Sequence, residues 1–352
     1  MPENNLKVAV IGLGNVGYEV AKHIAMMRPP EGAKYSIKEL ILFSTDKKKA
    51  DISRQILNGL KETETEISKS HASTLRDYSP HIAINCASIP EAKKYSDRRK
   101  MGELNLQLNR EISSALPEDA LEIIVSNHVL TLAQDAVSHC KRDPRLTIGC
   151  AHVDSIRAGI AIEDMLAGCV KGKLDKSNIF IIGSHDDNEM VLAYRSSTVN
   201  GIILDQLKSL SDKFLDIQAY AGLLAHMQIM AMQTTKELTA KAVTDTLNAV
   251  LTEKSYVSAG ILCDFKGAFF RADPDYFRFE KPREPVYAVM RAGFTGLKAG
   301  FVAGEDKSPN ISWFISQAGE TKRAFYSVAM KQFEHFKKVQ KRLQSQQSQK
   351  NN

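Results

Sequence analysis

A short apolar run followed at once by three closely spaced glycines constrains this fold more than any other feature of the sequence. Residues 7–11 read KVAVI, and residues 12–17 read GLGNVG. A β-branched run of this length that ends at glycine is typical of a buried parallel strand. Residues 18–27 then have helical periodicity. The segment therefore predicts a strand, a glycine turn and a helix, the unit that opens a doubly wound α/β sheet.

The same alternation continues through the first 150 residues. Further apolar runs suited to strands lie at residues 39–43, 81–85 and 121–125, with helix-like stretches between them at 49–60 and 104–116. Strands that alternate with helices predict a parallel sheet covered on both faces. We therefore expect an α/β protein whose residues 1–150 form a Rossmann domain.

The pattern becomes mixed after residue 150. The expected elements are a helix at 154–166, a strand at 178–182, a helical region at 205–252, strands at 256–263 and 286–291, and a last helix at 320–342. We expect a second, mixed α+β domain at 151–330. Residues 331–352 would hold the end of the last helix and a polar tail.

Composition narrows the class of protein. The 352 residues are 43% hydrophobic and 25% charged, which excludes disordered, collagen-like and coiled-coil chains. The net charge is only +6 and no basic tract is interleaved with aromatics, so we expect no nucleic-acid partner. Five cysteines without a CxxC pair, no export signal and no apolar run of membrane length predict a reduced, cytoplasmic protein that does not contact a membrane.

The three glycines match a dinucleotide-binding fingerprint because they directly follow a strand and open a helix. Gly12 would allow the tight turn, Gly14 the approach of backbone N–H groups to a pyrophosphate, and Gly17 the close packing of helix on strand. We assign Gly12, Gly14, Asn15, Val16 and Gly17 to cofactor binding. The alternative is a glycine loop without a ligand.

The end of the second expected strand bears on the choice between NAD and NADP. An NAD site favours an acidic residue there, whereas this chain has Ser44, Thr45, Asp46 and Lys47. Ser44, Thr45 and Lys47 would accept the 2′-phosphate of NADP. In the alternative, Asp46 holds the ribose of NAD and the lysines are a solvated helix start.

Two charged residues and a histidine form a second candidate site. Asp154 and Arg157 are three residues apart at a helix start and share a face; an ordinary surface ion pair is the alternative. His185 follows an apolar strand-like run, and histidine transfers protons well near neutral pH. Cys150, His152 and Asp154 alternate along the chain without an evident fourth ligand, so we predict no metal site.

The order of these motifs resembles the lactate/malate dehydrogenase family. The motifs are GLGNVG at 12–17, NCASIP at 85–90, VSN at 125–127, VDSIR at 153–157 and GSH at 183–185. The resemblance runs from about residue 6 into the last helix and is strongest in the first 200 residues. It implies an NAD(P)-dependent 2-hydroxy acid dehydrogenase that is a homodimer or homotetramer and acts on a small 2-oxo or 2-hydroxy acid.

Residue roles follow from this resemblance. His185 would be the acid/base, Asp154 its orienting partner and Arg157 the clamp on the substrate carboxylate. Asn127 would lie beside substrate and nicotinamide, and Thr235 would line the substrate pocket. The resemblance also assigns Ala87, Ser88, Ser126 and Asn127 to the cofactor site.

The chain departs from the family where an arginine normally polarises the substrate carbonyl. Gly102 or Glu103 occupies that position, at the end of a loop expected at 91–103. Arg98 or Arg99 would replace the missing arginine, unless this is only a solvated basic loop. The basic loop slightly favours a dicarboxylate such as malate. The motif also differs at His128, Ser184 and Asp186.

These departures leave two rival hypotheses. In one, the protein binds dinucleotide but has lost turnover. In the other, it transfers hydride to a different alcohol or carbonyl, and Arg157 has no carboxylate to bind.

Overall fold

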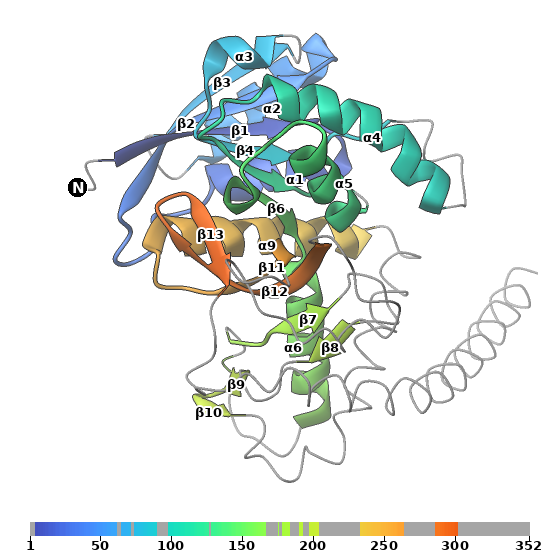
Figure 1. The fold of residues 1–352 in the computed structure, drawn as a ribbon. Coiled ribbons are helices and arrows are strands. Elements are labelled where there is room, and N and C mark those ends of the chain that lie inside the picture. Colours follow the sequence, from blue (N-terminus) through green and yellow to red (C-terminus); the bar gives the residue numbers. More distant parts are fainter. Residues whose placement is uncertain are drawn as a thin grey trace, which may run out of the picture.

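The computed structural model describes residues 4–61, 65–71, 74–89, 98–126, 128–166, 175, 178–183, 190–192, 197–203, 233–263 and 286–301. Its first half is a parallel sheet with helices on both faces (Figure 1). The strands are β1 (Asn4–Ile11), β2 (Tyr35–Ser44), β3 (Glu66–His71), β4 (Ile82–Asn85), β5 (Leu121–Ile124) and β6 (Thr147–Cys150). The helices are α1 (Asn15–Ala25), α2 (Lys47–Leu60), α3 (Leu75–Tyr78), α4 (Arg98–Ala115), α5 (Val129–Ser138) and the 3₁₀ turn η3 (Pro144–Leu146).

The six parallel strands lie in the order β3-β2-β1-β4-β5-β6. From the centre of the sheet, β1, β2 and β3 follow one another toward one edge, and β4, β5 and β6 toward the other. The loops after the neighbouring strands β1 and β4 therefore lead to opposite faces of the sheet. Such a switch point leaves a crevice at the carboxyl ends of the strands, where ligands of doubly wound sheets bind. The predicted α/β doubly wound fold is confirmed.

The second half extends the same sheet with antiparallel strands. Its elements are α6 (His152–Leu166), β7 (Ile181–Gly183), β8 (Met190–Leu192), β9 (Thr198–Val199), β10 (Ile202–Ile203), α9 (Gln233–Thr252), β11 (Val257–Cys263), β12 (Val286–Thr295) and β13 (Lys298–Phe301). From β6 the order continues β11-β12-β7-β8, with β13 paired to β12, while β9 and β10 form a separate pair. The division at residue 150 stays a prediction.

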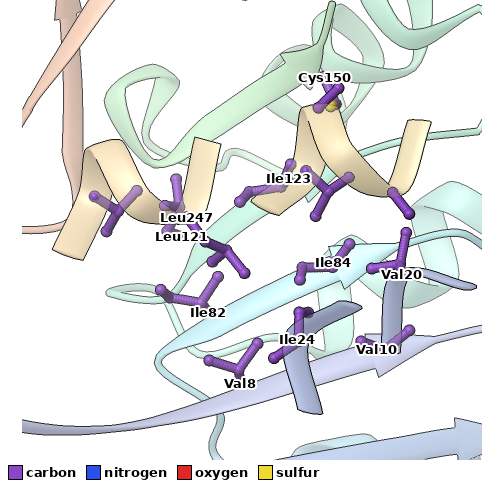
Figure 2. Packing of buried hydrophobic residues seen from close by; sticks show 14 of the residues in the cluster. Val8, Val10, Val20, Ile24, Ile82, Ile84, Leu121, Ile123, Cys150 and Leu247 are labelled. Carbon is purple, nitrogen blue, oxygen red and sulfur yellow. The ribbon is translucent and has the colours of Figure 1, made fainter. Parts of the chain in front are cut away.

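The main core lies between the sheet and two helices that are far apart in the sequence. Strand residues such as Val8, Ile84 and Ile123 point toward α1 and α9, which contribute Ile24 and Leu247 (Figure 2). The alternate strand residues pack on the opposite face against α3, α4 and α5. The sheet is therefore apolar on both faces, as expected for buried parallel strands.

Hydrogen bonds and an ion pair hold the C-terminal end of α9 at the amino ends of the parallel strands. Glu253 accepts hydrogen bonds from the Tyr35 hydroxyl (3.0 Å) and the Gly296 amide (2.7 Å), and it pairs with Lys34. Lys34 also donates its backbone N–H to the Leu251 carbonyl. This cluster joins α9 to the start of β2 and to the turn between β12 and β13.

Some expected elements differ from the observed ones. Strand β3 was missed because only Ile67 is a buried apolar residue of this edge strand, and β13 was missed because it is a four-residue strand after a turn. The expected loop 91–103 is wrong at its end, because α4 begins at Arg98 and takes in Arg99, Gly102 and Glu103. β7 begins three residues later than expected. The last helix at 320–342 lies outside the described residues.

No helix in the described part of the chain has the length and apolar character needed to cross a membrane.

We expect Gly17→Ala to destabilise the protein by about 3 kcal/mol, because a Cβ at Gly17 would lie 1.9 Å from the Gly12 carbonyl oxygen. Gly59→Ala is the control: no described atom lies within 4 Å of its Cβ position, and alanine in a helix should stabilise by about 0.5–1 kcal/mol. Urea denaturation of both variants measures the difference. Equal stability of the two would contradict this account of the β1–α1 packing.

Candidate active site

The glycine turn lies at the carboxyl edge of the parallel sheet, at the switch point. Gly12 has a φ of +88°, a left-handed conformation that favours glycine, and its N–H donates to the Phe43 carbonyl at 2.9 Å. A Cβ on Gly12 would lie 2.6 Å from the Cα of Ala87. Gly12 thus brings the end of β1 against the loop that follows β4.

Gly14 has no such structural reason to be glycine. Its φ is −66°, which any residue adopts, and no described atom lies within 4 Å of its Cβ position. It precedes α1, whose first turn contains no acidic side chain. The N–H groups at this end of α1, those of Asn15 and Val16 included, attract an anion. The residues present therefore fit a pyrophosphate that approaches the backbone at Gly14.

Residues 86–89, between β4 and α4, form the other wall of the switch point. The Cys86 N–H donates to the Ile11 carbonyl at 2.9 Å, and the Ser126 hydroxyl donates to the Ala87 carbonyl. The structure thus brings Ala87 and Ser126 together beside Gly12, as expected for residues of one cofactor site. Ser88, on the same loop, is exposed.

The end of β2 is organised as a helix start. The Ser44 hydroxyl is buried and accepts the Asp46 N–H at 3.1 Å, and Asp46 Oδ1 accepts the Lys49 N–H at 3.0 Å. Asp46 therefore caps α2, and Thr45 and Lys47 are exposed beside it. The four residues lie at the position where the adenosine ribose of a dinucleotide would meet the sheet.

Asp154 and Arg157 form a buried ion pair at the start of α6. Arg157 Nη1 lies 2.9 Å from Asp154 Oδ1, and the side chains are 9% and 2% exposed. The alternative of a surface ion pair is therefore wrong. Burying two charges costs desolvation energy that the pair only partly offsets, so such a pair is weak evidence for stability. A guanidinium held in this way is suited to binding a carboxylate.

His152 lies two residues before Asp154 and is also buried. Its Nδ1 accepts the Ser258 N–H at 3.2 Å, and its Nε2 lies 3.7 Å from Asp245 Oδ2. Burial lowers the pKa of His152 to about 4, against the opposing charge of Asp245. Burial raises the pKa of the Cys150 thiol to about 12, so this thiol stays protonated and is a poor metal ligand. Among the described residues, no three acidic, cysteine or histidine side chains are grouped to hold a metal.

Two serines that the sequence analysis did not select tie α6 to β7. The hydroxyls of Ser155 and Ser258 lie 2.6 Å apart, and both are within reach of the Ile181 N–H, at 2.9 and 3.2 Å. Ser155 follows Asp154 directly, and β7 ends two residues before His185. These hydrogen bonds therefore fix the position of β7 relative to the Asp154–Arg157 ion pair. Their role depends on contacts across 26 and 77 residues, which no local pattern encodes.

Several predicted site residues are not placed by the described structure. Asn127 and His185 lie outside the described residues. Arg98 and Arg99 are in the first turn of α4, and Thr235 is in the first turn of α9; only their backbones are described. Their assigned roles stay predictions.

The order of the parallel strands and the glycine turn at the switch point define the fold as a Rossmann-type α/β fold. Comparison with protein-family models and with curated proteins finds no match. Solved structures do match. A lactate dehydrogenase from Cryptosporidium parvum, complexed with lactic acid and nicotinamide adenine dinucleotide, superposes with a TM-score of 0.69 at 17% identity, over 94% of this chain and 99% of that one.

Malate dehydrogenases match equally well. The enzyme from Cryptosporidium parvum has a TM-score of 0.69 at 13% identity, over 93% of this chain and 99% of its own. The enzyme from Plasmodium falciparum, in complex with NADH, has a TM-score of 0.66 at 15% identity, over 92% and 99%. The chain therefore has the fold of the lactate and malate dehydrogenases, as the sequence motifs predicted.

We expect the His152→Asn variant to lose less stability than the wild type on acidification. The folded protein keeps His152 neutral down to about pH 4, whereas the unfolded chain takes up a proton near its usual pKa of 6.5. Stability from this group is thus complete above about pH 6.5 and falls by about 1.4 kcal/mol per pH unit between there and pH 4. Asparagine keeps an acceptor for Ser258 but does not titrate.

Urea denaturation at several pH values measures this difference. Gln55→Asn, at an exposed position of α2 that does not titrate, is the control and should follow the pH dependence of the wild type. Parallel pH curves for wild type and His152→Asn would contradict the assignment.

Proposed function

We propose that the protein is an NAD(P)-dependent oxidoreductase of the lactate/malate dehydrogenase type. The observation that carries this proposal is Gly14. Gly12 and Gly17 are needed for packing, whereas Gly14 leaves open space over the start of α1, and that is where a pyrophosphate needs a residue without a side chain. The fold shared with lactate and malate dehydrogenases supports the same function.

The cofactor would bind across the switch point. The N–H groups around Gly14, Asn15 and Val16 would hold the pyrophosphate, and Ala87, Ser88 and Ser126 would line the nicotinamide side. Ser44, Thr45 and Lys47 would accept the 2′-phosphate of NADP, or Asp46 the ribose of NAD. The bound nicotinamide supplies the hydride donor or acceptor.

The chain's own residues would bind the substrate and move its proton. Arg157, held by Asp154, would bind the carboxylate of a 2-oxo or 2-hydroxy acid in a bidentate manner. His185 would exchange a proton with the substrate hydroxyl, with Asp154 orienting it. Asn127 and Thr235 would complete the pocket.

The residues at the start of α4 bear on the choice of substrate and on whether the protein turns over. Arg98 and Arg99 supply positive charge, which favours a dicarboxylate of the malate type. By resemblance, Gly102 or Glu103 occupies the position of the arginine that polarises a carbonyl in the family, and both residues are inside α4. This observation favours, as the second candidate, a dinucleotide-binding protein with little turnover. We further propose a cytoplasmic homodimer or homotetramer.

Reduction of 2-oxo acids tests the activity. We expect oxidation of NADH or NADPH in the presence of a 2-oxo mono- or dicarboxylate, and loss of at least about a hundredfold in rate with His185→Asn. Absorbance at the reduced-nicotinamide band measures it. Cofactor binding without turnover across the panel would instead select the second candidate.

Binding of the cofactor is tested separately by Gly14→Ala. The methyl group enters open space, and alanine is only a poorer N-cap for α1 than glycine, so stability should fall by no more than about 1 kcal/mol while the affinity for reduced dinucleotide falls at least about tenfold. Fluorescence titration measures the affinity, with Gly59→Ala as the matched control. An affinity equal to that of the control would exclude the glycine turn as the pyrophosphate site.

A further inference from the structure

A carboxylate lies in the interior of the parallel sheet. Glu122 is the second residue of β5, a central strand, and its side chain is fully buried. Burial raises the pKa of this carboxyl group, against the opposing influence of Arg142 and of hydrogen bonds from Ser113 and Asn85. The other residues of β5 are apolar, and an apolar residue would fill this position without the free energy that burying a carboxyl group costs. Packing alone therefore does not explain a glutamate here.

Glu122 is held from two sides. The Ser113 hydroxyl of α4 donates to Oε1 at 2.9 Å, and Asn85 Nδ2 donates to the same oxygen at 3.3 Å. Arg142 Nε lies 3.8 Å from Oε2, and the same guanidinium donates to the Pro117 and Ala120 carbonyls. Oε1 thus accepts two hydrogen bonds from buried residues, whereas Oε2 and Arg142 Nε, 3.8 Å apart, make no hydrogen bond to any described residue.

Asn85 connects this buried group to the loop after β4. Its Oδ1 accepts the Ala87 N–H at 3.3 Å, while its Nδ2 donates to Glu122 and to Asn109 Oδ1 at 3.1 Å. Asn109 in turn donates to the Leu132 carbonyl. Because Ala87 supplies a donor and Glu122 an acceptor, only one orientation of the Asn85 amide satisfies both. Glu122 and Asn109 therefore together determine which atom of Asn85 faces the loop.

Residues 86–89, which Asn85 holds through the Ala87 N–H, contact the glycine turn. Ala87 lies against Gly12, and Cys86 Cβ is 3.1 Å from the Cβ position of Gly17. A second asparagine holds the last described residue of this segment, because Asn105 Oδ1 accepts the Ile89 N–H at 3.0 Å. A shift of residues 86–89 would therefore change the space beside the glycine turn.

We propose that Asn85 is a positioning residue for the dinucleotide, with Glu122 and Asn109 holding its amide in the orientation that fixes residues 86–89. This inference rests on the proposed function. It adds a control of cofactor affinity by residues that do not touch the cofactor. Residues that orient the ligands of a metal site act in the same way and change metal affinity by about 10–100-fold.

The test is Asn85→Asp, which keeps the shape of the side chain and replaces the donor to Glu122 by a second carboxylate. Two buried carboxylates in contact cannot both ionise, so they share a proton at low pH and repel at high pH. We expect NADH or NADPH affinity to fall at least about tenfold at about pH 8 and to recover in part at about pH 6. A merely structural loss would not produce this pH dependence.

Three further variants complete the design. Asn105→Ala releases the loop without touching Glu122 and should also weaken binding, which keeps the inference testable if Asn85→Asp does not fold. Ser113→Ala removes the hydrogen bond from α4 to Glu122 and leaves the contacts of Asn85 in place. It should lower the melting temperature but not the affinity for the dinucleotide. Asn5→Asp, at the exposed amino end of β1, is the control for the added charge.

Fluorescence titration with NADH and NADPH, alongside melting temperatures, separates the outcomes. A wild type that binds neither dinucleotide overturns the proposed function and this inference with it. A wild type that binds, with Asn85→Asp and Asn105→Ala unchanged in affinity, overturns this inference alone. Weakened binding by Asn85→Asp with no recovery at low pH would overturn the part assigned to Glu122.

Discussion

The close approach of α1 to the end of β1 is the constraint on which the rest of the structure depends. Gly17 lets the helix lie against the Gly12 carbonyl, and Gly12 lets the turn lie against Ala87. These contacts place the start of α1 at the switch point of the sheet and bring α1 beside α9 over the main core. Packing and ligand binding therefore use the same turn, and Gly14 is the member of the motif that packing leaves unexplained.

Polar and charged groups are buried in the half of the parallel sheet that holds β5 and β6 and at the start of α6. Glu122, the Asp154–Arg157 pair and His152 all lie in or beside β5, β6 and the start of α6, although apolar residues would fill these places at lower cost. Each has specific partners, and each is near an expected ligand-binding residue or a loop that positions one. The amino edge is held instead by the Glu253 cluster, which joins α9 to β2 and the β12–β13 turn.

Much of this fold was predictable because its signals are local. The β-branched runs at β1, β2, β4 and β5 and the glycine spacing predicted the parallel sheet and the turn between β1 and α1. The edge strand β3 carries one buried apolar residue and gave no such signal. Asn85, Ser155 and Ser258 were missed because their partners lie on other elements, up to 103 residues away, and only the folded chain brings them together. The buried state of Asp154 and Arg157 also follows from tertiary packing and not from their spacing.

A crystal structure of the protein with bound NADH or NADPH tests the central claim most directly. The account predicts that the pyrophosphate lies over Gly14, within hydrogen-bond distance of the N–H groups that begin α1, with the nicotinamide beside residues 86–89. A dinucleotide bound elsewhere on the protein, or a pyrophosphate that makes no contact with the Gly12–Gly17 turn, would contradict it.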